Sequence, residues 1–306
     1  MVLRLDALTK DFSTGLFGRR RHRALDALSF EVGRGEVFGL LGPNGAGKTT
    51  TLKLINALLW PTSGRVTILD RAPADPVARA AIGFLPEHPA FYDHLTGEEL
   101  LQYFGGLCGL SSTDARVSAA RSLDRVGLDA ARRRPVRQYS KGMVQRLGLA
   151  QALINEPQVV VLDEPMSGLD PVGRREVREL ILELRDAGRT ILFSSHILSD
   201  AEQLCSRVVI LRQGRLVAEG PTTELTGGQV RGWEITATGL TPASAAALQT
   251  QAQRATRIAH GRYVFEVAVD VRPETVVAAI VAQGGRLESV VPLRATLEDV
   301  FVERTA

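Results

Sequence analysis

The segment that most constrains this chain is Gly42-Pro43-Asn44-Gly45-Ala46-Gly47-Lys48-Thr49, which fits the pattern G-x-x-x-x-G-K-[ST]. A strand-like apolar run over residues 36–41 precedes it, and a helical pattern of apolar residues follows it and stops at Trp60-Pro61. Glycines let the backbone curl so that successive N–H groups point at phosphate oxygens, and the following helix adds its positive end. The segment therefore predicts a phosphate-binding turn between a strand and a helix.

Most residues of this phosphate loop have an expected role in binding the nucleotide. Lys48 is expected to reach the β- and γ-phosphates, and the Thr49 hydroxyl is expected to ligate Mg²⁺. The alternative is a glycine-rich turn without a ligand, but the Lys-Thr pair and both flanking elements argue against it. The loop alone does not separate an ATPase from a GTPase or a small-molecule kinase. The residues expected to hold the nucleotide here are Gly42, Pro43, Asn44, Gly45, Ala46, Gly47, Lys48, Thr49 and Thr50.

Two carboxylates follow the apolar run over residues 159–162, where the carboxyl end of a buried strand is expected. Asp163 can support Mg²⁺, directly or through water. Glu164 is placed to polarise the water that attacks the γ-phosphorus. His196, after another apolar strand over residues 190–194, is expected to hydrogen-bond the γ-phosphate, although a lone histidine there is more often structural. Glu164, His196 and Lys48 form the expected catalytic set, and Asp163 is assigned to the metal.

Strands alternate with helices over the first three quarters of the chain, which predicts a largely parallel sheet with helices on both faces. Residues 2–8 are expected to form an edge strand, with further strands over 27–32 and 208–211. Apolar residues at helical spacing predict a helix that stops at Gly188. Residues 89–152 look mostly helical and predict an inserted subdomain.

A second, smaller domain is expected after a boundary near Thr226-Gly227-Gly228. The order of strands and helices there is β-α-β-β-α-β, which suggests a ferredoxin-like module, with a closing helix that starts at Thr296 and carries Asp299 in its first turn. The expected elements are a strand over 233–237, a helix over 242–252, a hairpin around His260-Gly261, a helix from Pro273 and a strand over 287–293.

Composition and charge exclude several classes of protein. The net charge of +3 is too small to indicate extensive nucleic-acid binding, so no nucleic-acid partner is expected. The basic runs at residues 19–23 and 132–134 are interpreted as solvated loops or helix ends, with anionic lipid or an acidic partner as the alternative for the first. Cys108 and Cys205 lack metal spacing, which favours a reducing compartment. No apolar run is long enough for a membrane helix, so we expect a cytoplasmic protein that reaches a membrane only through a partner.

The segment Tyr139-Ser140-Lys141-Gly142-Met143-Val144-Gln145-Arg146 resembles the signature motif of the ABC ATPase family. Ser167-Gly168-Leu169-Asp170-Pro171 resembles the family's D-loop, His196 its switch histidine, and Phe84-Leu85-Pro86-Glu87 stands in the place of the Q-loop. The resemblance covers residues 2–225. It implies an α/β P-loop NTPase domain over residues 1–226 with a helical subdomain over about 88–155. The α+β accessory domain predicted from the element order then covers residues 229–306.

The resemblance also implies a head-to-tail pair of cassettes that enclose two ATP molecules. Each site would join the phosphate loop of one subunit to Ser140 and Gly142 of the other, and the D-loop residue Asp170 is also assigned to the nucleotide. The second cassette would be a copy of this chain, which we expect, or a homologue. The aromatic residue that stacks on adenine would be Phe12, with Phe17 as the alternative; a phenylalanine that only packs in the structure is an equal possibility.

Some signature and Q-loop residues depart from the commonest family form. Lys141 and Met143 stand where Gly and Gln are usual, and Glu87 replaces Gln. Glu87 is nevertheless assigned to Mg²⁺ together with Thr49 and Asp163, although it adds negative charge near the phosphates.

The signature, Glu87 and the ending over residues 296–301 look like those of ATPases of ABC-2-type exporters. That likeness implies a separate transmembrane permease and a peripheral position on the inner face of the cell membrane. Residues 87–101 would couple to the permease, with Phe91, Tyr92 and Leu95 either exposed for that contact or buried in the helical subdomain. The alternatives are a soluble ABC ATPase that acts on nucleic acid or the ribosome, and a C-terminal module that senses a ligand and gates the ATPase.

Overall fold

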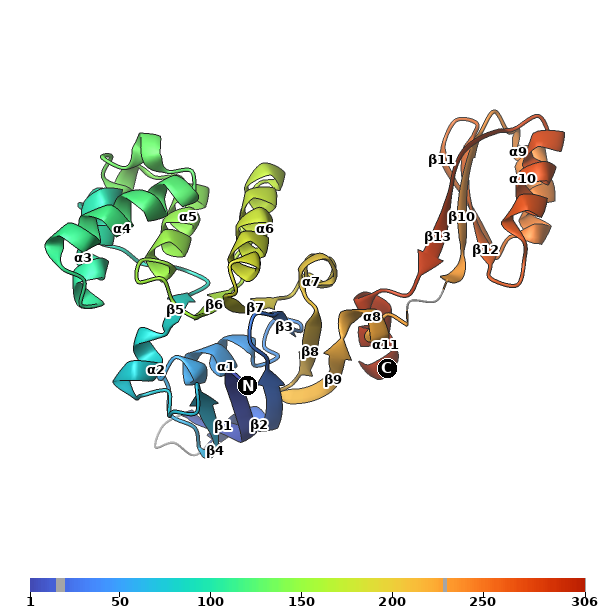
Figure 1. Cartoon of the computed structure of the whole chain (residues 1–306). Coiled ribbons are helices and arrows are strands. Elements are labelled where there is room, and N and C mark those ends of the chain that lie inside the picture. The colour runs from blue at the N-terminus through green and yellow to red at the C-terminus, as the bar shows by residue number, and fades with distance from the viewer. Residues whose placement is uncertain (15–19, 228–229, 306) are drawn as a thin grey trace. The chain divides into compact units, whose positions relative to one another are not determined.

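The computed structural model describes residues 1–14, 20–227 and 230–305 and divides into two compact units (Figure 1). The first unit is Met1–Thr222 together with the end of the last helix from Arg304, and the second is Thr223–Glu303. Among the described helices, none combines the length and the apolar character that a bilayer crossing requires.

A six-stranded sheet forms the centre of the first unit, in the order β5-β6-β7-β3-β8-β9. Its first five strands are parallel, and β9 pairs antiparallel with β8. Every residue of β3, β6 and β7 is buried, as the apolar run in each sequence predicts for strands covered on both faces. The strands are β3 (Val37–Leu41), β5 (Ile82–Leu85), β6 (Val159–Asp163), β7 (Thr190–Ser195), β8 (Arg207–Arg212) and β9 (Arg215–Pro221).

A three-stranded antiparallel sheet in the order β2-β1-β4 lies in the same unit. Its strands are β1 (Leu3–Thr14), β2 (Arg20–Val32) and β4 (Ser63–Ile68). The prediction of an edge strand over residues 2–8 is wrong, because β1 is the central strand. The basic run is also not a loop: residues 20–23 form the start of β2, while Arg19 lies outside the described residues.

The helix α1 (Lys48–Ile55) begins directly after the phosphate loop, as expected. It ends earlier than Trp60, because the Asn56 side chain donates a hydrogen bond to the Leu52 carbonyl at 2.8 Å and Ala57 adopts a positive φ of 53°. Gly188 has a φ of +79° and follows α6, which confirms the predicted stop. Other helices before residue 226 and outside the inserted block are α2 (Pro76–Ala80), α6 (Pro171–Asp186), α7 (Leu198–Leu204) and α8 (Thr222–Leu225).

Three helices form the inserted block between β5 and β6, and they lie together in Figure 1. They are α3 (Gly97–Leu107), α4 (Ser112–Arg125) and α5 (Lys141–Ala152), with 3-10 turns at Asp129–Ala131 and Val136–Gln138. The end of α5 sits directly on β5, because a Cβ atom on Gly83 would clash with the Ala152 carbonyl. This contact fixes the helical block to the sheet.

The second unit is an antiparallel sheet in the order β11-β12-β10-β13, with α9 and α10 on one face (Figure 1). Fully buried Ile235, Phe265 and Ile280 form part of its core. The order β-α-β-β-α-β is confirmed, although the helix expected over 242–252 ends at Leu248 and continues as a 3-10 turn. The elements are β10 (Val230–Thr238), α9 (Pro242–Leu248), β11 (Arg254–Ala259), β12 (Arg262–Ala268), α10 (Pro273–Ala282), β13 (Arg286–Arg294) and α11 (Leu297–Thr305).

Candidate nucleotide-binding site

The phosphate loop joins β3 to α1 and depends on glycine at specific positions. Gly42, Gly45 and Gly47 have φ values of +148°, +80° and +107°, which side chains disfavour. A Cβ atom on Gly47 would also lie 2.8 Å from the Ala24 carbonyl oxygen. The loop is thus held against β2, and its curved backbone suits the binding of an anion by main-chain N–H groups.

Lys48 crosses from this loop to the end of β6. Its side chain is only 6% exposed, its ammonium group donates a hydrogen bond to the Gly42 carbonyl at 2.7 Å, and Nζ lies 3.3 Å from Glu164 Oε1. The buried cation is therefore paired, as a charge in this environment requires.

Asp163 and Glu164 end β6 and are tied to β7 by one hydroxyl group. Ser194 Oγ donates to Asp163 Oδ1 at 2.6 Å and accepts the Glu164 N–H at 3.0 Å. Burial raises the pKa of Asp163, and the nearby negative charge of Glu87 raises it further. Ser194 and Thr49 act in the opposite direction, because their hydroxyl groups favour the charged carboxylate. Thr49, Glu87 and Asp163 are thus close enough to influence one another. Ser194 was not predicted as a site residue.

Glu164 lies between two partners from different elements. His196 Nδ1 is 2.8 Å from Glu164 Oε2, and Lys48 contacts the other carboxylate oxygen. Glu164 also has a φ of +49°, a strained conformation for a residue with a side chain. The structure therefore brings together the three residues expected to act in catalysis.

One cavity of about 380 Å³ joins this cluster to the first two strands. Phe12 and Glu87 line it, as expected, and Phe17 lies outside the described residues. His22 and Ala24 of β2 also line it. Sequence analysis missed both, because His22 lies within, and Ala24 directly follows, the basic run that was interpreted as a loop or helix end. The remaining lining residues are Pro43, Asn44, Gly45, Ala46, Gly47, Lys48, Thr49, Thr50 and Glu164.

Four of the residues predicted to bind the nucleotide do not line this cavity: Gly42, Ser140, Gly142 and Asp170. Gly42 begins the phosphate loop itself, whereas the other three lie at the starts of two helices. Ser140 is the N-cap of α5, and its hydroxyl accepts the Met143 N–H at 3.3 Å, while Gly142 lies in the first turn of the same helix. Asp170 begins α6, and its carboxylate accepts the Gly173 N–H at 2.9 Å. The phosphate cavity of this chain therefore includes none of the residues expected at the starts of α5 and α6.

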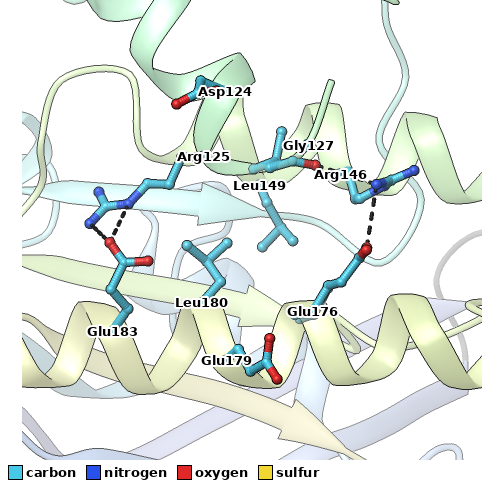
Figure 2. A pocket seen from close by; sticks show the side chains of 11 residues that line it. Asp124, Arg125, Gly127, Arg146, Leu149, Glu176, Glu179, Leu180 and Glu183 are labelled. Carbon is cyan, nitrogen blue, oxygen red and sulfur yellow. Dashed lines mark hydrogen bonds and ion pairs between the residues drawn. The ribbon is translucent and has the colours of Figure 1, made fainter. Parts of the chain in front are cut away.

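A second cavity, of about 330 Å³, lies between the end of α4, α5 and α6 (Figure 2). Arg125 and Glu183 pair at 2.6 Å on one side, and Arg146 and Glu176 pair at 3.3 Å on the other. Leu149 and Leu180 lie between the two pairs. These arginines are already paired, and no glycine loop is present, so this cavity lacks the features of a phosphate site. Its ion pairs instead join α6 to the helical block.

The segment before α3 exposes one of the three apolar residues expected to contact a partner. Tyr92 is 52% exposed, whereas Phe91 and Leu95 are half-buried. The Tyr92 ring packs edge-on against Tyr103, which is itself exposed, with 5.6 Å between centroids. A small aromatic surface therefore remains open to solvent.

Comparison with known proteins gives a consistent result over most of the chain. The family model described as ABC transporter matches residues 25–167. The chain is 41% identical over 299 residues to the ABC transporter ATP-binding protein sll0415 of Synechocystis, covering 97% of this chain and 82% of the relative. It is 38% identical over 307 residues to the daunorubicin resistance ATP-binding protein DrrA3 of Streptomyces coeruleorubidus, covering 98% and 96%. It is 44% identical over 205 residues to a fluoroquinolones export ATP-binding protein of Mycobacterium tuberculosis, covering 66% of each chain.

Solved structures show the same likeness. The chain superposes on the dimeric post-hydrolysis state of the ATP-binding cassette MJ0796 bound to ADP and Pi with a TM-score of 0.66 and 26% identity, covering 72% of this chain and 98% of that one. The ATP-binding subunit of an ABC transporter matches with a TM-score of 0.66 and 32% identity, covering 74% and 92%.

Proposed function

Because this chain belongs to the family of ABC transporter ATP-binding proteins, we propose that it hydrolyses ATP to drive a membrane exporter, through closure of two cassettes around the nucleotide. The relatives above that carry a functional name are named for daunorubicin resistance or fluoroquinolone export, which supports the exporter. None of the relatives named above is described as acting on nucleic acid or the ribosome.

The observation that carries the chemistry is the Glu164 carboxylate, held between Lys48 at 3.3 Å and His196 at 2.8 Å beside the glycine loop. In the proposed step Glu164 accepts a proton from water as the water oxygen bonds to the γ-phosphorus. The bond from that phosphorus to the β–γ bridging oxygen breaks, and ADP leaves with the electron pair. Lys48 stabilises the charge on the β- and γ-phosphates, and His196 holds the γ-phosphate and the water.

Mg²⁺ is proposed to bind at Thr49 and Asp163, with Glu87 as a further ligand, directly or through water. Thr49 and Glu87 both lie close enough to Asp163 to influence the pKa of its carboxyl group. A hydroxyl and one or two carboxylates suit Mg²⁺, which takes its other ligands from water and substrate phosphates. The ion would neutralise charge on the transferred phosphoryl group.

A second copy of the chain is proposed to complete each nucleotide site. Ser140, Gly142 and Asp170 lie at the N-termini of α5 and α6, away from this chain's own phosphate cavity. Helix N-termini favour anions, so these ends suit the nucleotide bound to the partner. The dimeric cassettes among the solved relatives support this arrangement. Phe12 would stack on adenine.

The remaining assignments concern the membrane and the domains. We place the chain on the cytoplasmic face of the membrane, beneath an ABC-2-type permease that meets exposed Tyr92 and its half-buried neighbours Phe91 and Leu95. A cassette over residues 1–226 and an accessory domain over 229–306 are supported by the compact units that divide at Thr222.

The catalytic proposal is tested with Glu164→Gln, which keeps the side-chain shape but removes the base. We expect ATP binding to persist, an ATP-dependent dimer to accumulate, and phosphate release to fall by at least about 100-fold, within the range for loss of a general base. Glu179→Gln is the matched control, because Glu179 is exposed on α6 and, among the described residues, forms an ion pair only with Arg175. Undiminished hydrolysis by Glu164→Gln would reassign the base.

The exporter proposal needs a separate experiment. The tagged chain is purified from detergent-solubilised membranes, and co-purifying proteins are identified by mass spectrometry. A multi-span membrane protein that stimulates ATP hydrolysis is expected. Recovery of ribosomes or nucleic acid alone would contradict the proposed role in an exporter. The proposed ATPase activity would be unaffected by that result.

A further inference from the structure

The hairpin of β1 and β2 places two rings side by side on the wall of the nucleotide cavity. Phe12 and His22 are directly opposite each other in the antiparallel register. The adjacent pair, Asp11 and Arg23, forms an ion pair at 2.9 Å, and Ser13 pairs with Arg21 on the other side. Because side chains alternate between the two faces of a strand, Phe12 and His22 share the face opposite to that ion pair. Both of them line the cavity.

The position of His22 relative to the phosphate loop follows from β2. Ala24 lies against the start of α1, since its carbonyl oxygen would be 2.8 Å from a Cβ on Gly47. His22 is the next residue on the same face, about 6.6 Å farther along the strand. A nucleotide whose phosphates occupy the loop would therefore extend its sugar and base over the wall formed by Phe12 and His22.

His22 has the chemistry for that end of the nucleotide. Its side chain is exposed, and it makes no hydrogen bond to another residue in the described part of the chain. A neutral imidazole offers one donor and one acceptor, which match the sugar hydroxyls and the polar edge of a purine. Phe12 supplies only an apolar ring face, so it cannot form hydrogen bonds with the sugar hydroxyls or the polar edge of the purine.

We propose that His22 recognises the nucleoside part of ATP by a hydrogen bond, beside the stacking surface of Phe12. The inference rests on the proposed ATPase function and names a binding residue within the same site. It assigns no step of the hydrolysis to His22. The imidazole therefore contributes to affinity for the nucleoside and not for the phosphates.

The test measures the dissociation constants of ATP and of inorganic tripolyphosphate, each with Mg²⁺, for the full chain by competition against a fluorescent ATP analogue. His22→Ala is expected to raise the dissociation constant of ATP by about 3- to 10-fold, the effect of one hydrogen bond, and to leave tripolyphosphate unchanged. His22→Phe keeps a ring without the hydrogen bond and should weaken ATP equally. Arg21→Ala, on the opposite face, is the matched control and should change neither constant.

A comparison with 2′-deoxyATP shows which part of the nucleoside accepts or donates the hydrogen bond. If the effect of His22→Ala disappears with 2′-deoxyATP, the hydrogen bond goes to the sugar; if it persists, the bond goes elsewhere on the nucleoside. An unchanged ATP affinity in His22→Ala, or equal weakening of ATP and tripolyphosphate, would overturn the inference. These results differ from failure of the proposed function, in which the wild-type chain itself would not hydrolyse ATP.

Discussion

Ser194 offers the most informative single substitution, because one buried hydroxyl serves both carboxylate positions. Ser194 is 0% exposed, and its Oγ donates to Asp163 at 2.6 Å while accepting the Glu164 N–H at 3.0 Å. Ser194→Ala removes both interactions without adding volume. The Asp163 carboxylate loses a donor, and the Glu164 amide becomes an unpaired buried donor.

The magnitude follows from these two losses. A hydrogen bond to a charged group contributes about 1.5–3 kcal/mol, and an unsatisfied buried amide costs about 1–3 kcal/mol. Since the two effects overlap, we expect a loss of about 3 kcal/mol in the free energy of unfolding. For a unit of this size that corresponds to a fall in Tm of roughly 6–12 °C. Ser195→Ala should cost less than about 1 kcal/mol, because in the described part of the chain the Ser195 hydroxyl bonds only the backbone of Ile197, and those bonds are partly buried, not fully buried as at Ser194.

The assay compares thermal unfolding and phosphate release for the two variants in the full chain. Ser194→Ala should melt well below Ser195→Ala and should hydrolyse ATP more slowly, because the Asp163 and Glu164 positions both depend on it. Equal melting temperatures would show that the hydroxyl bridge does not stabilise the ends of β6 and β7. Our account of how the carboxylates are positioned would then be wrong.

Three further perturbations test other parts of the structure. Lys48→Ala should weaken ATP binding itself, and wild-type affinity in a titration would contradict the phosphate contact. Gly83→Ala should lower the free energy of unfolding by more than about 3 kcal/mol, because the added Cβ atom would clash with backbone atoms. Gly106→Ala should be neutral or stabilise α3 by up to about 1 kcal/mol, because no atom lies within 4 Å of its Cβ position. Urea unfolding measures both effects. Hydrogen bonds from Thr296 lower the pKa of Asp299. The ionised Asp299 carboxylate therefore stabilises α11 by less than about 1 kcal/mol, and this stabilisation should be lost as the pH falls through the lowered pKa. Asp299→Ala should abolish this pH dependence, which amide hydrogen exchange of α11 would measure.

The sequence predicts the central chemistry well because that chemistry depends on local order. The glycine pattern before Lys48 determines a backbone shape, and the apolar run before Asp163 determines a buried strand, so both could be located without tertiary contacts. The C-terminal order of elements was also predictable, since Pro273 and the His260-Gly261 turn mark element ends directly.

The features that sequence analysis missed depend on long-range pairing. An alternating strand such as β1 carries no signal that separates the centre of an antiparallel sheet from its edge. Ser194 has no distinctive neighbours, and only the pairing of β6 with β7 brings it to Asp163. His22 follows three arginines, and it reaches the nucleotide cavity only because β2 aligns it with Phe12.

The ion pairs around the cavity in Figure 2 have a mechanical consequence. They couple α6 to α4 and α5, so the helices that start at Asp170 and at Ser140 would rotate as one rigid body. A force applied to the helical block would then displace both of the helix ends that we propose to face a second cassette. Because these pairs are partly exposed, dissolved salt would screen them, and the displacement transmitted between helices would shrink as ionic strength rises.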